Sequence, residues 1–86
     1  MYLYLGEETV ILTGDIVGIF DLENTSTSGA TKQYLRSAQR GGRVTAVSSD
    51  LPKSFVVCAS GGKQRVYLSL ISPATLKKRA AFLGNV

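Results

Sequence analysis

Apolar and polar residues are patterned along the first part of the chain in a way that predicts short strands. An aromatic and aliphatic segment, Tyr2 to Leu5, is followed by Gly6-Glu7-Glu8 and then by the β-branched segment Thr9 to Thr13. Glycine and polar residues between two β-forming segments are typical of a turn, so this region predicts a hairpin. A third strand is predicted over 16–20, where Gly18 indicates a bulge or a close packing contact.

The middle of the chain predicts an amphipathic helix from about Ala30 to Arg40, after a polar loop over 25–29 whose hydroxyl groups suit a helix cap. The side expected to pack on the sheet carries Thr31, Tyr34, Leu35 and Ala38. The opposite side carries a cation every four residues: Lys32, Arg36 and Arg40. Gly41-Gly42 then predicts the end of the helix, because glycine adopts a positive φ at little cost.

The second half predicts more strands and a final helix. A strand is expected over 43–47, followed by a loop that contains Pro52. Strands over 55–59 and 65–71 flank a Gly61-Gly62 turn, and these two are expected at the centre of the sheet. Ser72 predicts a cap for a helix that begins at Pro73 and reaches about Gly84. Its apolar face is expected to carry Leu76, Ala80 and Leu83.

This order of elements predicts a single α+β domain over residues 1–86, with a small, mainly antiparallel sheet, one helix in the middle and one at the C-terminus. At 9.2 kDa the chain is too short for two ordinary domains. Its 44% hydrophobic and 19% charged residues are typical of a globular protein. A domain this small is marginally stable alone, so self-association would stabilise it.

Composition excludes several kinds of chemistry. The chain has no histidine and one cysteine, which leaves neither an imidazole for catalysis nor a Cys/His zinc site. Ser60-Gly61-Gly62-Lys63 lacks the spacing of a phosphate-binding P-loop. We therefore expect a protein that is not an enzyme and needs no metal or cofactor, the rival interpretation being catalysis by carboxylates alone. The sequence shows neither a signal peptide nor a membrane span, so a cytoplasmic location is expected.

The charges are strongly segregated along the chain. Five acids and no base lie before residue 24: Glu7, Glu8, Asp15, Asp21 and Glu23. All ten bases come later, accompanied by one acid, Asp50. Three interpretations remain open: a basic surface for a polyanion, a head-to-tail contact between the acidic side of one subunit and the basic side of the next, or a solvated surface without a partner.

The candidate contacts to phosphate are cations on the middle helix and on the last hairpin. Lys32, Arg36 and Arg40 span two helical turns and could follow a nucleic-acid backbone, or could be the solvated face of the helix. Lys63 and Arg65 lie beside a glycine turn, where backbone and cation could approach a ligand together, although an ordinary turn without a ligand is the favoured interpretation. Lys77-Lys78-Arg79 point in different directions on a helix, and solvation is favoured for them. Cys58 is expected as a small buried apolar residue.

Three blocks of sequence resemble the RemB branch of the bacterial RemA/RemB family of extracellular matrix regulatory proteins. They are 16–22 (IVGIFDL), 50–58 (DLPKSFVVC) and 71–79 (ISPATLKKR), together with the opening MYLYLG. The resemblance covers the chain to about Arg79. Through the RemA branch, the resemblance implies a small α+β domain similar to the LytTR DNA-binding fold, assembled into rings that bind DNA and activate biofilm matrix genes in Firmicutes.

The chain departs from the RemA pattern at the positions expected to bind DNA. RemA-like members carry two adjacent arginines where this sequence has Leu51-Pro52, and a base where it has Asp15. Lys53 is the nearest cation. If DNA is bound, the helix stripe, Arg43, Lys53, Lys63 and Arg65 are expected to supply the phosphate contacts.

Two functional hypotheses follow. The first is a non-enzymatic regulator of the RemB type that forms a homo-oligomeric ring and binds the backbone of double-stranded DNA through its basic surface. The second is an oligomeric scaffold that recruits a protein partner and does not bind nucleic acid. Neither hypothesis involves a membrane.

Overall fold

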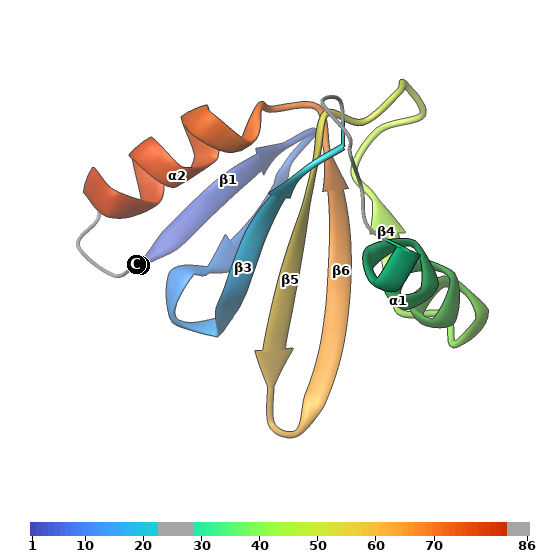
Figure 1. The fold of residues 1–86 in the computed structure, drawn as a ribbon. Helices are drawn as coiled ribbons and strands as arrows, with labels where there is room; N and C mark the ends of the chain where they lie inside the picture. The colour runs from blue at the N-terminus through green and yellow to red at the C-terminus, as the bar shows by residue number, and fades with distance from the viewer. Residues whose placement is uncertain (23–28, 83–86) are drawn as a thin grey trace.

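A computed structural model describes residues 1–22 and 29–82, and the predicted α+β class is confirmed. The elements are β1 (Tyr2–Gly6), β2 (Thr9–Leu12), a short 3-10 helix (Thr13–Asp15), β3 (Ile16–Asp21), α1 (Gly29–Arg40), β4 (Val44–Ala46), β5 (Ser54–Ser60), β6 (Lys63–Ser69) and α2 (Pro73–Phe82). The strands form two sheets instead of the single one expected (Figure 1). Most of the predicted loop 25–29, as well as Glu23 and Leu83, lies outside the described residues.

The larger sheet has the strand order β3-β5-β6-β4, so β5 and β6 are central as predicted. Its pairs are antiparallel except for β4 and β6, which are parallel. The smaller sheet is the predicted β1–β2 hairpin, in which Tyr2 pairs with Leu12 and Tyr4 with Val10. Its turn is tight enough to place Glu7 and Glu8 at positive φ.

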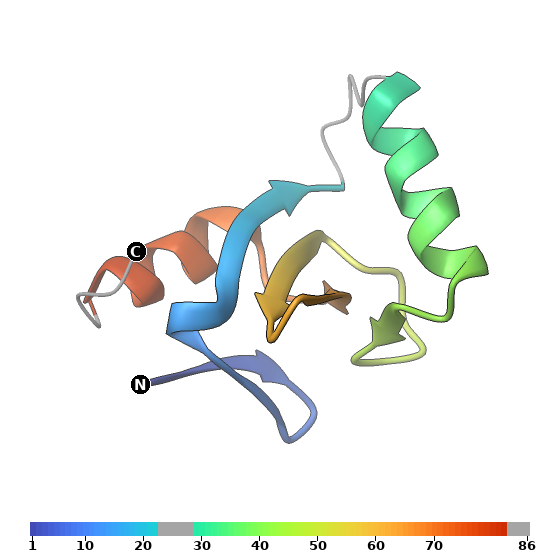
Figure 2. The same ribbon diagram turned by 90° about the horizontal axis from the view of Figure 1, so that it is seen from below.

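Both faces of the larger sheet are covered, by different elements (Figure 2). On one face α1 packs through Ala38 against Phe55, Val57 and Val66. On the other face the β1–β2 hairpin and α2 pack against alternate residues of the same strands, including Val56 and Cys58. Successive side chains of a strand point to opposite faces, which explains why β5 is apolar almost throughout and buried from Ser54 to Cys58.

Two helix ends are confirmed where the sequence marks them, since α1 ends at Arg40 and α2 begins at Pro73, whereas the predicted end near Gly84 lies outside the described residues. After α1, the Gly42 amide donates to the Gln39 carbonyl and the Arg43 amide to the Ala38 carbonyl, with Gly42 at φ +70°. This is a Schellman cap, which needs a residue that tolerates positive φ. Before α2, the Ser72 hydroxyl oxygen accepts a hydrogen bond from the Thr75 amide at 3.3 Å. Leu76 and Ala80 are fully buried on the predicted apolar face.

Gly18 combines the two roles expected of it. The pairing of β3 with β5 shifts register between Ile16 and Gly18, which is a bulge. A Cβ at Gly18 would lie 2.6 Å from the ring of Phe20. That ring stacks on Phe55 with a centroid distance of 4.9 Å, so the missing side chain leaves room for the stacking.

Candidate nucleic-acid interface

The helix stripe faces solvent as predicted. Lys32, Arg36 and Arg40 are exposed, while Ala38 on the opposite side of α1 has no exposed surface. Arg40 lies in the last turn, where a cation interacts favourably with the helix dipole. The stripe ends at the Gly41-Gly42 turn, and the chain then leads directly to Arg43.

Three further predicted cations meet in one cavity beyond this turn. We call it the basic cavity: a volume of about 670 Å³ whose walls include Asp15, Arg43, Cys58, Lys63, Arg65 and Tyr67, together with the Gly41-Gly42 turn. It opens on the hairpin side of the main sheet, at the end of β5 and the beginning of β6. The fold therefore brings Arg43 beside Lys63 and Arg65, which follow it by 20 and 22 positions in the sequence.

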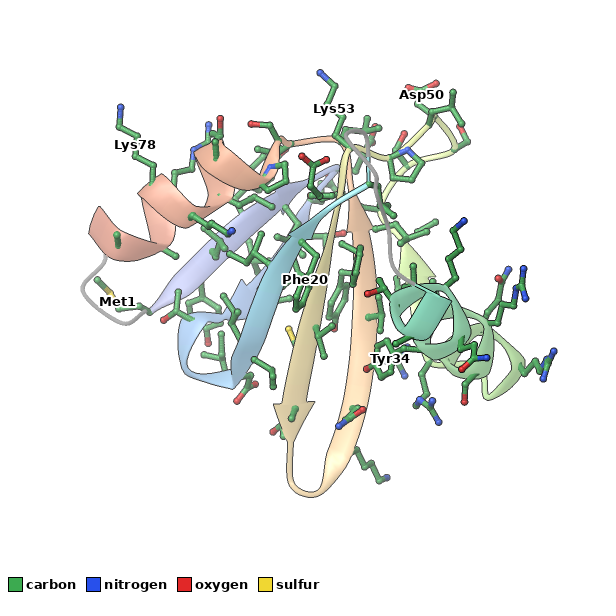
Figure 3. All side chains as sticks on the ribbon, in the orientation of Figure 1. Met1, Phe20, Tyr34, Asp50, Lys53 and Lys78 are labelled. Carbon is green, nitrogen blue, oxygen red and sulfur yellow. The ribbon has the colours of Figure 1, made fainter. Side chains whose placement is uncertain are left out.

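Lys53 does not join this group. It precedes β5, whereas Lys63 follows the turn at the far end of the same strand. The seven residues of β5 separate the two by about 20 Å at 3.3 Å per residue. Figure 3 shows Lys53 at the end of the sheet near Asp50. Three of the seven predicted cations thus lie on α1, three line the basic cavity beyond its C-terminal turn, and Lys53 is separate from both.

The charge segregation seen along the sequence is incomplete in space. Asp15 lines the basic cavity, because the antiparallel pairing of β3 with β5 sets Ile16 beside Cys58. Asp21 lines a second hollow together with Lys77. Two acids are therefore mixed with downstream bases, which corrects the expectation of a purely acidic side, whereas Glu7 and Glu8 remain exposed at the hairpin tip.

Cys58 is a buried apolar residue, as predicted, with 7% of its surface exposed. Desolvation, and secondarily the charge of Asp15, raises the pKa of the thiol to about 11. A neutral thiol is a poor nucleophile, so the residue adds no reactive group to the cavity. Within residues 1–22 and 29–82, no three His, Cys, Asp or Glu side chains gather as metal ligands would.

Sequence reasoning did not place Asp15 beside the cations, and it missed Tyr67 as part of the cavity wall. Tyr67 could have been found from the period of two along β6, which places it on the same face as Lys63 and Arg65. No local pattern indicates Asp15, because its place beside the cavity depends on the pairing of β3 with β5, which are remote in sequence; only the comparison with the RemA pattern marked its position as one expected to bind DNA.

The fold and the site define a small α+β protein whose described surface carries grouped lysine and arginine side chains. Among the described residues, no three His, Cys, Asp or Glu side chains form a metal site. No helix in that part is long and apolar enough to cross a membrane. A scan against models of protein families finds no match.

The chain is similar over its full length to extracellular matrix regulatory protein B of Bacillus subtilis (strain 168). The two are 39% identical over 86 residues, which cover all of this chain and 98% of the relative. The chain therefore belongs to the RemB-type extracellular matrix regulatory proteins, and the predicted resemblance is confirmed. The predicted likeness to the LytTR fold stays a prediction.

Proposed function

We propose that this protein is a non-enzymatic regulator of extracellular matrix genes that works in the cytoplasm as a homo-oligomeric ring and binds the backbone of duplex DNA. The observation that carries the proposal is the row of exposed cations Lys32, Arg36 and Arg40 along the outer face of α1, which ends at the Gly41-Gly42 turn that also lines the basic cavity. Lysine and arginine gain affinity for DNA by releasing the counterions of the phosphates. A grouped set can contact successive phosphates, which scattered surface charges cannot.

Two different apolar surfaces support self-association. The outer face of the β1–β2 hairpin leaves apolar side chains exposed in adjacent cross-strand pairs: Tyr2 64%, Tyr4 49%, Val10 52% and Leu12 44%. A second surface is a groove of about 300 Å³ between β3 and α1, lined by Val17, Phe20, Tyr34 and Phe55 among others. Contiguous exposed apolar patches of this kind are typical of interaction sites.

The two apolar surfaces lie next to side chains of opposite charge, which suits a head-to-tail contact between subunits. The exposed acids Glu7 and Glu8 lie at the tip of the hairpin, whereas the groove is bordered by α1, which carries the exposed cation Lys32. A contact between two different surfaces of one chain is heterologous, and it closes into a ring when the rotation between subunits allows. Attraction between the acids at the hairpin tip and the cation of α1 would favour this hairpin-to-groove contact over a hairpin-to-hairpin contact.

Fluorescence anisotropy with labelled duplex DNA across a salt series tests the DNA-binding part. Phosphate-driven binding weakens with a log-log slope of about −0.9 per contacted phosphate. Replacing Lys32, Arg36 and Arg40 together by Gln should make this slope shallower by up to about 3. The matched control replaces Lys77, Lys78 and Arg79 by Gln, which removes the same charge from α2. Equal effects of the two triple variants would show that only net charge matters and would contradict the proposed site.

The second candidate function, an oligomeric scaffold for a protein partner, is favoured by one observation. Leu51, which stands where RemA-like members have an arginine, is 90% exposed. An exposed leucine in place of a cation suits a protein contact better than a phosphate. An oligomer by light scattering that gives no anisotropy change with DNA at low salt would support the scaffold and exclude the DNA-binding regulator.

A further inference from the structure

Two arginines lie side by side on the floor of the basic cavity. In the parallel pairing of β4 with β6, Val44 lies opposite Val66 and Thr45 opposite Tyr67. Arg43 and Arg65 each come one residue earlier, and the Arg43 carbonyl accepts a hydrogen bond from the Val66 amide at 2.8 Å. Like charges on directly neighbouring strands destabilise a sheet. A bound anion in the cavity that both arginines line would offset their two positive charges.

The backbone of Arg43 and the side chain of Arg65 are held in place before any ligand arrives. The Arg43 amide donates to the Ala38 carbonyl at 2.8 Å, which fixes this residue to the end of α1. Its Nε is buried and has no hydrogen-bond partner among the described residues. Arg65 donates from Nη1 to Thr45 Oγ1 at 3.0 Å. An unpaired buried N–H is costly, and a rotation of the Arg43 side chain that brings Nε to the oxygen of a bound anion would supply the missing acceptor.

The rest of the cavity suits a ligand larger than a single anion. Its volume of about 670 Å³ falls within the range typical of small-molecule sites, about 300 to 1,000 Å³. Lys63 adds a third, exposed cation at the rim, and Tyr67 supplies an aromatic wall. Asp15 provides a carboxylate that can accept hydrogen bonds from N–H groups. Around Gly42 and Gly62 the space is open, so ligand atoms can approach the backbone closely.

We propose that the basic cavity binds a phosphorylated small molecule of the nucleotide class. Its phosphate lies between Arg43 and Arg65 with Lys63 at the rim, and its heterocycle lies against Tyr67 and donates to Asp15. Guanidinium groups match the geometry of phosphate oxygens, and aromatic rings stack on nucleobases. This site does not depend on the proposed binding of DNA. A backbone phosphate of DNA has the same chemistry, so the experiment must separate the two sources.

Isothermal titration of the full chain with AMP, GMP and inorganic phosphate tests the proposal. We expect a mononucleotide to bind more tightly than inorganic phosphate, because Tyr67 and Asp15 contact the nucleoside. Arg43→Gln and Arg65→Gln should each weaken nucleotide binding about tenfold or more, since a charge-assisted hydrogen bond is lost. Asp15→Asn should weaken the nucleotide and leave inorganic phosphate unchanged or slightly tighter.

The controls keep the proposal falsifiable if Arg43→Gln unfolds the protein. Lys63→Gln changes an exposed residue at the turn and should also weaken the nucleotide, whereas Lys78→Gln removes the same charge from exposed α2 and should not. Circular dichroism checks the folding of each variant. No heat from either mononucleotide at millimolar concentration, or equal binding by Lys63→Gln and Lys78→Gln, would overturn the proposal. If Arg65→Gln loses binding to duplex DNA and the wild type binds no mononucleotide, the cavity is a site for the DNA backbone. That result would also overturn the proposal.

Discussion

The hydroxyl of Ser69 donates a hydrogen bond of 2.8 Å to the carbonyl of Leu5, joining the central strand of the larger sheet to the hairpin that covers it. Both residues are fully buried, and they are 64 positions apart in sequence. The same Ser69 oxygen accepts from the Ile71 amide at 3.1 Å, which fixes the turn toward α2. One small polar side chain therefore connects the hairpin, the larger sheet and the approach to the last helix.

Replacing Ser69 by Ala should lower the free energy of unfolding by about 1 to 3 kcal/mol, because the buried Leu5 carbonyl loses its donor. Urea denaturation followed by circular dichroism measures the loss. Ser60→Ala, at an exposed position next to the β5–β6 turn, serves as control and should change stability by less than about 0.5 kcal/mol. Equal stability of Ser69→Ala and Ser60→Ala would show that this link contributes nothing.

Gly18→Ala should destabilise the protein by about 1 kcal/mol, because the new methyl group displaces the Phe20 ring from its stacking on Phe55. In a Phe20→Ala background the space is free, and the same change should be neutral or stabilising, since alanine loses less backbone entropy than glycine. A double-mutant cycle from urea denaturation gives the coupling between the two positions. An identical cost of Gly18→Ala in both backgrounds would place the strain in the backbone instead.

Local elements of the fold can be predicted from the sequence because their signals are local. Gly41-Gly42 and Ser72-Pro73 mark helix ends by their own conformational and capping preferences, and Gly61-Gly62 marks the β5–β6 turn. The division into two sheets has no such signal. The hairpin is apolar on both faces, so its pattern does not show that Leu3 and Leu5 are buried while Tyr2 and Tyr4 are exposed.

The candidate site divides in the same way. The exposure of the α1 stripe follows from helical period alone, and it is confirmed. The cavity depends on the parallel pairing of β4 with β6, which sets Arg43 beside Arg65, and pairing between remote segments leaves no periodic trace in the chain. Lys53 shows the opposite case. It is next to Leu51-Pro52, the position of the RemA arginine pair, yet the structure does not place it near the other cations.

The pH dependence of stability should carry a contribution from Cys58. Burial raises the pKa of the folded thiol from 9.0 to about 11, so the unfolded chain loses this proton first as pH rises. The folded state is therefore destabilised progressively between pH 9.0 and about 11, and this loss is absent below that range. Comparing urea denaturation of the wild type and Cys58→Ala across this range isolates the contribution, because the other groups titrate in both.

The same burial predicts slow alkylation of Cys58. Iodoacetamide reacts with the thiolate, so at pH 8 the native thiol should react at least about tenfold more slowly than in urea, as expected from its raised pKa and its limited access. Mass spectrometry of timed samples gives the two rates. Equal rates in buffer and in urea would mean that the strand carrying Cys58 opens readily and that this part of the core is not stable.

Self-association should depend on the hairpin face and on the groove, and on no other exposed apolar residue of comparable size. Replacing Tyr2 and Tyr4 by Ser removes aromatic surface that is 64% and 49% exposed in the single chain, so folding should be preserved while subunit affinity falls about thirtyfold or more. Phe20→Ser, which changes the groove between β3 and α1, should also weaken subunit affinity. Light scattering at micromolar concentration gives the mass of each variant.

Leu51→Ser is the matched control for these variants, because Leu51 is 90% exposed and lies outside both the hairpin and the groove. In a head-to-tail ring, mixing the Tyr2→Ser/Tyr4→Ser variant with Phe20→Ser should restore one intact contact per pair, since each variant keeps the surface that the other lacks. The mixture should therefore form dimers, whereas each variant alone should be monomeric. A hairpin-to-hairpin contact predicts the opposite, because Phe20→Ser would then assemble by itself, and that result would exclude the head-to-tail arrangement.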